Sequence, residues 1–264
     1  MVELILSSFG RPFIYLFELI ERFGIFILFQ IRLLGLYPLV FRRMRLVLTQ
    51  IEVIGIGCMG VITLTALFTG MVEAIQLYDG FHNFGVENFI GYTIFLSITK
   101  ELGPVFAALM LISRSVSAMA AELGTMRVSE QIDAIDILGV NSKEYLITPR
   151  IIATVISLPL LVIWFDSIAI ASSYVISTGV LGINPIAYQD ALMRLGEFSD
   201  IMTGVIKAVF FGFIVSSIGT YIGYHTSGGA RGVGQSTIYA VVYSAVAIFI
   251  SNYFLSSFFL YLDW

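Results

Sequence analysis

The sequence has 264 residues, of which 58% are apolar and 12% are charged, and its net charge is −4. A typical soluble domain carries about 25% charged residues, so the low charge and a mean hydropathy of +0.94 exclude an ordinary soluble globular protein. The acidic balance gives no support for nucleic-acid binding. The single cysteine, Cys58, excludes an internal disulfide and a cysteine-based zinc site.

Residues 1–48 form an amphipathic region in which apolar side chains recur at helical spacing from Phe13 to Phe23. Charged residues interrupt this stripe, which is typical of a helix lying at the headgroup boundary and not of a cleavable signal peptide. The alternative is a sixth, poorly formed span through residues 23–41. It would place Arg32 in mid-membrane, at a cost of about 2.5 to 3.5 kcal/mol, and would put the N-terminus outside.

Five later segments are long and apolar enough to cross a bilayer, which takes about 20 residues. The sequence therefore predicts an all-α integral membrane protein with five transmembrane helices in a domain over residues 49–264, preceded by the interfacial region 1–48. The spans are predicted at residues 51–75, 88–119, 151–177, 200–224 and 237–261.

Positive charges gather on one side of the predicted spans and set their orientation. Eleven lie in segments that share one face, and the opposite loops hold only Arg194. Because Lys and Arg are retained in the cytoplasm, the sequence predicts a cytoplasmic N-terminus and an external C-terminus. The eleven are Arg11, Arg22, Arg32, Arg42, Arg43, Arg45, Arg114, Arg127, Lys143, Arg150 and Arg231.

The first predicted span contains Gly55, Gly57 and Gly60 in the spacing G-x-G-x-x-G. This spacing occurs in dinucleotide-binding proteins, but there it follows a strand in a βαβ unit, which this apolar segment cannot supply. Small residues in a membrane span let helices approach closely. We therefore expect these glycines to pack helices, with Cys58 as a small apolar filler.

The loops show no catalytic or metal-binding pattern. His82 and His225 have no companion ligands and are expected to be solvated. The glycine-rich residues 227–234 lack the Lys-Ser/Thr ending of a phosphate-binding loop and predict a tight turn. We therefore predict no catalytic residue and no metal site, and nowhere does the sequence contain a Walker A motif.

Two charges and a helix breaker, Lys100, Glu101 and Pro104, lie in the middle of the second predicted span. Charges at that depth are costly and usually face a cavity or each other. Pro104 removes the backbone N–H that would bond to residue 100 and permits a kink there. We expect Lys100 and Glu101 to contact a substrate or line a polar path, and pairing for packing alone is the alternative.

Asp166 and Lys207 also lie at membrane depth, in the third and fourth predicted spans. Counted from the outer ends of these spans, they lie about 16 and 10 Å deep at 1.5 Å per residue. The similar heights predict an ion pair between them, with a role in transport as the alternative. Asp166 has a second possible partner in Lys100.

Residues 121–140 form a polar, helix-like stretch between the second and third spans. Val128, Ile132, Ile135 and Leu138 form an apolar stripe, and an acidic stripe of Glu130, Asp133 and Asp136 runs beside it. Acidic faces are repelled by anionic lipid. The pattern therefore favours docking to a partner protein over resting on the membrane.

These segments together resemble the MlaE family of ABC-transporter permeases, also called the YrbE type. The resemblance runs from about residue 51 to the C-terminus, and the combined order of its motifs is specific. Some relatives have Arg where this chain has Lys100. Arg can make a bidentate contact with a phosphate, whereas Lys100 offers only a point charge. The motifs are ELGPV and AAL within residues 101–114, AELGTMRVSEQIDA at 121–134, TPRIIATVISLPLL at 148–161 and GGARGVGQSTIYAVVYS at 228–244.

The resemblance implies a homodimeric permease of the bacterial inner membrane that moves phospholipid between the inner and outer membranes and maintains outer-membrane lipid asymmetry. It implies two copies of a cytoplasmic ATPase, which would hold ATP and Mg²⁺, so no cofactor is expected on this chain. It also implies a periplasmic MCE-domain lipid-binding protein, and a small ATPase-associated subunit is a further possible partner.

The resemblance further implies that residues 121–140 are the coupling helix that the ATPase grips. From the charges in the second span we predict that Lys100 and Glu101 line a cavity at the dimer interface that opens outward. Another hydrophobic cargo, such as a sterol, and an ion-coupled secondary transporter are the alternatives. The path candidates are Lys100, Glu101, Lys207 and Asp166, and the coupling candidates are Glu122, Arg127, Glu130, Gln131 and Asp133.

Overall fold

The computed structural model describes residues 20–21 and 23–262, and over these residues the regular structure is helical, with no strand. Five long helical rods are apolar enough to cross a membrane, which confirms the five predicted spans. They run over Met44–His82, Ile90–Val128, Lys143–Gly179, Phe198–Tyr224 and Gly229–Tyr261.

Three of the rods are composed of consecutive helices that continue one another. The first contains α2 (Met44–Ile51), the π-helical turn η2 (Glu52–Ile56) and α3 (Gly57–His82). The second contains α4 (Ile90–Ser97), α5 (Gly103–Leu111) and α6 (Ser117–Val128), joined by the π-helical turns η4 (Ile98–Leu102) and η5 (Ile112–Val116). The third joins the π-helical turn η6 (Lys143–Ile147) to α8 (Thr148–Gly179), and the last two are α10 (Phe198–Tyr224) and α11 (Gly229–Tyr261).

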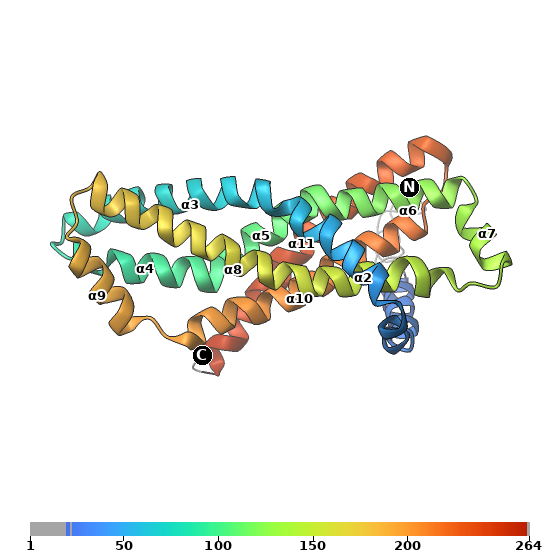
Figure 1. Cartoon of the computed structure of the whole chain (residues 1–264), viewed down its shortest axis with the longest axis horizontal. Helices are drawn as coiled ribbons and strands as arrows, with labels where there is room; N and C mark the ends of the chain where they lie inside the picture. Colours follow the sequence, from blue (N-terminus) through green and yellow to red (C-terminus); the bar gives the residue numbers. More distant parts are fainter. Residues whose placement is uncertain (1–19, 22, 263–264) are drawn as a thin grey trace, which may run out of the picture.

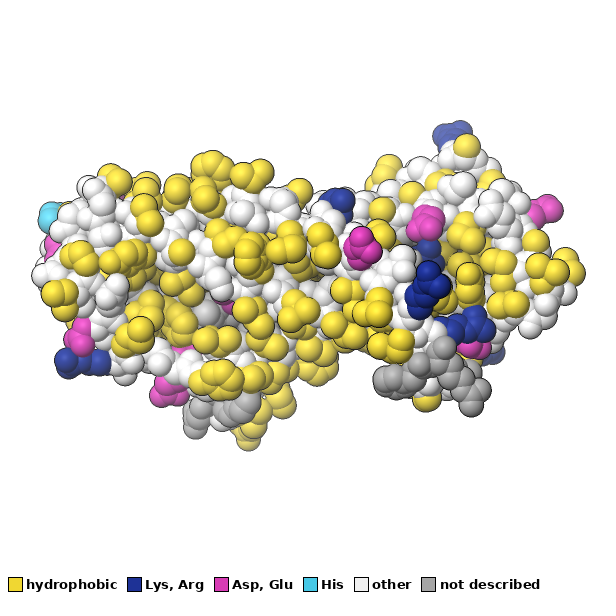
Figure 2. Space-filling model, viewed as in Figure 1, with side chains coloured by type: hydrophobic (Ala, Val, Ile, Leu, Met, Phe, Trp, Pro, Cys, Tyr) yellow, Lys and Arg dark blue, Asp and Glu magenta, His cyan; other side chains and the backbone are white. Residues whose placement is uncertain are grey.

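The rods lie along an elongated bundle with two ends, and α10 and α11 stop well short of one of them (Figure 1). One end holds the short helix α7 (Gln131–Ile137) and is called the α7 end, and the other holds α9 (Pro185–Leu195) and is called the α9 end. The second rod has 39 residues and is therefore about 58 Å long, almost twice a hydrocarbon core of about 30 Å. Both ends therefore project from the membrane, and Figure 2 shows apolar side chains along the length between them.

Glycines allow the rods to approach closely at two points. A Cβ atom at Gly70 on α3 would overlap the Ala169 carbonyl oxygen of α8, and one at Gly204 on α10 would overlap the Thr99 carbonyl oxygen of η4. Membrane helices associate through such small residues because lipid provides no hydrophobic drive between them. The second contact holds α10 directly against the segment that carries Lys100 and Glu101.

The predicted glycine pattern in the first rod divides into three different environments. A Cβ at Gly55 would lie 3.1 Å from Ser157 Oγ, a close helix contact as expected. Gly57 instead leaves room for the Arg114 guanidinium, and Gly60 has nothing within 4 Å. Gly57 therefore also admits a close contact with another rod, through a side chain, and the expectation of helix packing is wrong only for Gly60 among the described residues. Cys58 is buried, as expected, with Sγ 3.1 Å from Ser115 Oγ.

The N-terminal region contributes a short apolar helix over Phe23–Leu34 and a 3₁₀ helix, η1 (Tyr37–Arg43). The helix is about 18 Å long, too short for a sixth span. Phe29 and Leu33 pack against Tyr224 and other residues at the α7 end, and most of the remaining apolar side chains are exposed. This geometry fits the predicted interfacial helix, whose earlier stripe from Phe13 lies outside the described residues.

The polar stretch predicted as one helix over residues 121–140 is divided in two. Residues 121–128 continue the second rod as the last part of α6, and α7 begins at Gln131. Glu130, between them, has φ 59°, a left-handed conformation that a helix cannot continue through. The separate helix at the α7 end is therefore only α7.

The two histidines differ from each other. His82 is exposed and bonds Glu87 Oε1 through Nδ1 at 2.6 Å, which agrees with a solvated loop residue. The ring of His225 packs against Tyr221, Phe29 and Tyr224, with ring centroids 4.4, 5.3 and 5.3 Å away. His225 is exposed, as expected, and in addition packs against these rings because the N-terminal helix folds back onto the end of α10.

Candidate functional site

The Lys207 ammonium is the centre of a charged cluster at membrane depth. Lys207 is 1% exposed, and its Nζ donates to Glu101 Oε1 at 2.8 Å. It donates also to the Lys100 carbonyl oxygen at 2.8 Å and to Ser256 Oγ at 2.7 Å. All three ammonium protons therefore have acceptors, which meets the requirement for a charge away from water.

Pro104 explains why a lysine from another helix bonds to the backbone here. Proline has no N–H, so the carbonyl of Lys100 loses its usual helical donor. The chain widens into the π-helical turn η4 at this point, a feature that is often found at functional sites. Lys207 then supplies the missing donor, so the kink predicted from the proline also creates a binding position for the ammonium.

The last rod closes the cluster with two polar side chains four residues apart. Asn252 Nδ2 donates to Glu101 Oε2 at 2.9 Å, and Ser256 Oγ donates to Glu101 Oε1 at 2.7 Å. Positions four apart lie on the same face of a helix. The Glu101 carboxylate therefore ties α11 to η4 and α10.

Lys100 points away from this cluster and pairs with Asp200, with Nζ 2.8 Å from Oδ1. Asp200 lies in the first turn of α10, where its Oδ2 also accepts from the Glu197 backbone N–H at 2.9 Å. Both residues line a polar pocket of about 380 Å³ near the start of α10. This polar pocket is lined by Tyr92, Lys100, Leu195, Glu197, Ser199, Asp200 and Leu260.

Asp166 lies apart from both ion pairs. It is 6% exposed, its Oδ1 has no hydrogen-bond partner among the described residues, and a Cβ at Gly103 would overlap that oxygen. The predicted pairing of Asp166 with Lys207 is wrong, and so is the alternative pairing with Lys100. Equal height does not place two side chains on facing sides of their helices, and Lys207 faces η4 instead.

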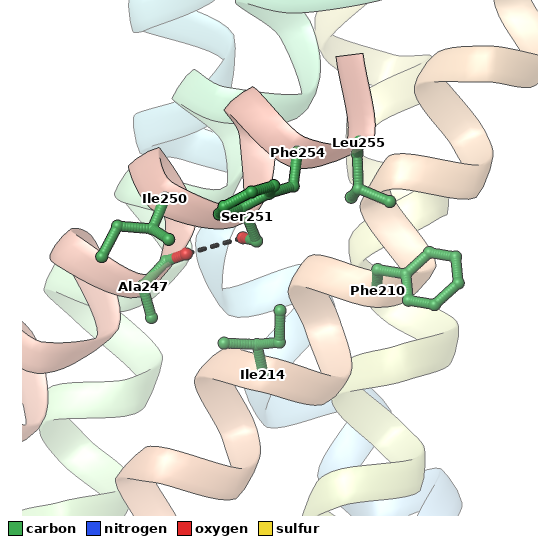
Figure 3. Close-up of a pocket in the computed structure, with 7 residues that line it drawn as sticks. All are labelled: Phe210, Ile214, Ala247, Ile250, Ser251, Phe254 and Leu255. Atoms are coloured by element: carbon green, nitrogen blue, oxygen red, sulfur yellow. Dashed lines mark hydrogen bonds between the residues drawn. The ribbon is translucent and has the colours of Figure 1, made fainter. Parts of the chain in front are cut away.

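An apolar groove lies between α10 and α11 (Figure 3). It measures about 410 Å³, and its single hydroxyl, Ser251 Oγ, donates to the Ala247 carbonyl of its own helix at 2.6 Å. The groove therefore offers only apolar surface to a ligand. Its lining residues are Phe210, Ile214, Ala247, Ile250, Ser251, Phe254 and Leu255.

The predicted coupling residues lie at the α7 end and are largely exposed. Arg127 Nη1 bonds Asp133 Oδ1 at 2.6 Å and so joins α6 to α7, while Glu130 and Gln131 are exposed. Glu122 faces another way and pairs with Arg150 at 2.9 Å. The structure thus brings four of the five together, and Glu122 belongs to a separate contact with the third rod.

At the α7 end, sequence reasoning included Leu138 in its apolar stripe but missed the exposed Ile137 and the anchoring contact of Asp136. Ile137 and Leu138, at the tip of the segment, are 85% and 80% exposed. Asp136, predicted to lie on the free acidic stripe, accepts from Ser142 N and Oγ at 3.0 and 3.1 Å. Ser142 Oγ also lies 3.0 Å from Tyr224 OH, which connects the tip to the end of α10.

No group of three or more His, Cys, Asp or Glu side chains that could hold a metal ion occurs within residues 20–21 and 23–262. The charged side chains of the Lys207 cluster and of the Lys100–Asp200 pair have hydrogen-bond partners, whereas Asp166 Oδ1 has none among the described residues. Their arrangement is suited to binding a polar group at membrane depth.

Known proteins provide a family context for this geometry. Residues 47–258 match the family described as Permease MlaE. A probable ABC transporter permease protein of Rickettsia bellii is 40% identical over 255 residues, which cover 97% of each chain. The intermembrane phospholipid transport system permease protein MlaE of Haemophilus influenzae is 32% identical over 249 residues, 94% of each. The chloroplastic protein TRIGALACTOSYLDIACYLGLYCEROL 1 of Arabidopsis thaliana is 43% identical over 212 residues, 80% of this chain and 61% of that one.

Proposed function

The chain belongs to the MlaE family of ABC-transporter permeases, and on that premise we propose that it moves phospholipid between the inner and outer membranes of a bacterial envelope. It is the multi-pass transmembrane component of an ABC transporter, and such a permease works with an ATPase partner. The proposed outcome of its activity is the maintenance of outer-membrane lipid asymmetry.

The observation that carries this proposal is a change from polar to apolar surface along the seam between α10 and α11. The seam begins with the polar pocket at Asp200, continues through the Lys207 cluster and reaches the apolar groove at Ile214. From Asp200 to Ile214 the rise is about 21 Å, about half of a bilayer that is 40–45 Å thick with its headgroups. A phospholipid has the same length and the same polarity gradient.

We assign the path residues by their position on this seam. Lys100 lines the polar pocket and would bind the phosphate. Glu101 and Lys207 lie between the polar pocket and the apolar groove, where their ion pair would hold the helices of the seam together. Phe210 and Ile214 lie three and seven residues after Lys207, so they are on the same face of α10 as Lys207. They line the apolar groove, which would receive the acyl chains. Asp166 is buried against Gly103, so we assign it to support of η4 and not to lipid contact.

The proposed assembly places the α7 end in the cytoplasm and the α9 end outside. On the cytoplasmic side, α7 and the exposed Ile137 and Leu138 would dock on the ATPase. Two copies of this ATPase would carry ATP and Mg²⁺. A second copy of the permease would complete a homodimer, and an MCE-domain protein would bind at the α9 end. A small ATPase-associated subunit is a further proposed partner.

Thiol labelling tests the orientation. Asn83 and Leu138 are exposed at opposite ends, and the native Cys58 is buried. In intact cells a membrane-impermeant reagent should label Asn83→Cys and not Leu138→Cys. Labelling of both, or of Leu138→Cys alone, would contradict the proposed orientation.

ATP-driven transfer of labelled phospholipid tests the proposed function. The permease–ATPase complex in proteoliposomes should transfer phospholipid to an acceptor lipid-binding protein with ATP and not with a non-hydrolysable analogue. Transfer that is equal under both conditions, or absent while ATP is hydrolysed, would contradict it.

A neutral sugar-headed lipid is the competing cargo, because the Arabidopsis relative bears the name of a galactolipid. The same proteoliposomes loaded with a labelled galactolipid distinguish the two. Faster transfer of the galactolipid than of the phospholipid would favour this second candidate.

A further inference from the structure

The polar pocket at the start of α10 has an excess of negative charge. It is lined by one cation, Lys100, and two carboxylates, Glu197 and Asp200. Lys100 and Asp200 pair with each other at 2.8 Å. Glu197 Oε2 accepts from Ser199 Oγ at 3.0 Å, and no cation pairs with Glu197 among the described residues. With its ion pair formed, the pocket therefore keeps one carboxylate, Glu197, that caps the backbone of α10 and has no side-chain cation among the described residues.

We propose that this pocket selects phospholipids whose head group carries an ammonium, such as phosphatidylethanolamine, over those with a purely anionic head group. This inference rests on the proposed function and names its substrate class. It assigns Glu197 and Asp200 as specificity-determining residues.

The Lys100–Asp200 pair explains how the selection works. Lys100 Nζ has three N–H donors and pairs with Asp200 Oδ1 at 2.8 Å, so a lipid phosphate that binds this ammonium shares the single cation with Asp200. The Asp200 side chain is 7% exposed, so little water would screen the two negative groups from each other. A head-group ammonium supplies a second cation beside Asp200, and one ion pair is thereby replaced by two.

The second carboxylate strengthens this preference. Glu197 lies in the same pocket and would attract the same ammonium, and Tyr92, an aromatic residue of the kind that binds cations, also lines it. An anionic head group such as phosphatidylglycerol brings its phosphate without a cation. It would add negative charge beside Asp200 and Glu197, and like charges at close range disfavour binding.

The experiment is lipid competition in the intact permease–ATPase complex. The purified complex is equilibrated in nanodiscs with equal amounts of phosphatidylethanolamine and phosphatidylglycerol, and the bound lipids are counted by native mass spectrometry. The parental complex should enrich phosphatidylethanolamine about fivefold, the upper range for one exposed charge pair. Glu197→Gln, which retains side-chain hydrogen bonding at the start of α10, should reduce the ratio toward one, and Glu197→Lys should invert it.

Asp190→Lys on α9 is the matched control. Asp190 is exposed, pairs with Arg194 at 2.7 Å and does not line the polar pocket, so this charge reversal should leave the lipid ratio unchanged. Equal binding of both lipids by the parental complex, or a ratio that Glu197→Lys does not move, would overturn the inference while total lipid binding still supports the proposed function. Absence of both lipids from the complex would contradict the proposed function itself.

Discussion

Two groups of charged residues in this permease use similar ion pairs in opposite surroundings. At membrane depth, Lys207 is 1% exposed and pairs with Glu101. At the α7 end, Arg127 and Asp133 are 36% and 53% exposed. Breaking a buried pair strands a charge away from water, whereas an exposed pair contributes little to stability. The comparison indicates that the first group holds the fold together and that the second is free to bind a partner.

Lys207→Met should produce the largest loss of stability. It removes a buried ammonium and leaves the Glu101 carboxylate without its ion-pair partner, which costs about 3 kcal/mol, the lower figure for such pairs because Glu101 is 44% exposed. The measurement is thermal unfolding of the purified protein in detergent. The double variant Lys207→Met/Glu101→Gln should be more stable than Lys207→Met alone. If its loss of stability instead equals the sum of the losses in the two single variants, the two charges are not coupled.

Asn252→Ala should have the next largest effect. It removes one hydrogen bond to the Glu101 carboxylate and loosens α11, at a cost of about 1.5 kcal/mol for a bond to a charged group. Ser257→Ala is the control, because Ser257 is exposed on the same helix. If both variants unfold at the same temperature, the link between α11 and the cluster contributes nothing to stability.

Charge reversal at the α7 end should leave stability nearly unchanged. Glu130→Lys/Asp133→Lys should alter the free energy of unfolding by less than about 1 kcal/mol, because both residues are exposed. The same variant should lose the ATPase in co-purification, whereas Asp79→Lys, exposed on α3 at the other end, should retain it. An intact complex with parental transport would contradict the proposed docking role.

His225 should make a small, pH-dependent contribution. Packing among the aromatic rings lowers its pKa below the usual 6.5, and the nearby Lys143 and Arg127 charges lower it further. The unfolded chain therefore binds a proton more readily, so stability is complete above about pH 6.5 and declines as the pH falls below it. His225→Gln should flatten this slope between pH 7.5 and 5, measured by thermal unfolding, and an unchanged slope would exclude His225 as its source.

The five spans could be predicted from the sequence because hydropathy alone determines which segments lipid can solvate. The pairings at membrane depth could not, because counting residues gives the height of a side chain and not the direction it faces. Asp166 and Lys207 have similar heights, yet Lys207 turns toward η4. Two signals were available: Pro104 deprives one carbonyl of its donor, and Asn252 and Ser256 repeat at a helical spacing of four.

The α7 end was predicted less completely, for a local reason. The stripe from Val128 to Leu138 follows helical spacing, but the backbone at Glu130 is left-handed and interrupts it. Glutamate gives no sequence signal for that conformation, which favours glycine and asparagine. The new helix α7 then ends at Ile137, so Ile132 within it is buried against the bundle and Leu138 beyond it is exposed, although the pattern places both in one stripe.

The most direct test of the account is phospholipid transfer by the permease–ATPase complex carrying Lys100→Gln. Lys100 is 30% exposed, and Asp200 keeps its hydrogen bond to the Glu197 backbone without it. Because Asp200 then lacks its cation in surroundings with little water, the variant should unfold at a lower temperature than the parental protein. The complex that still assembles should transfer phospholipid about tenfold more slowly, as expected for the loss of about 1.4 kcal/mol of phosphate contact. A stable Lys100→Gln complex that transfers phospholipid at the parental rate would contradict the claim that this pocket receives the head group.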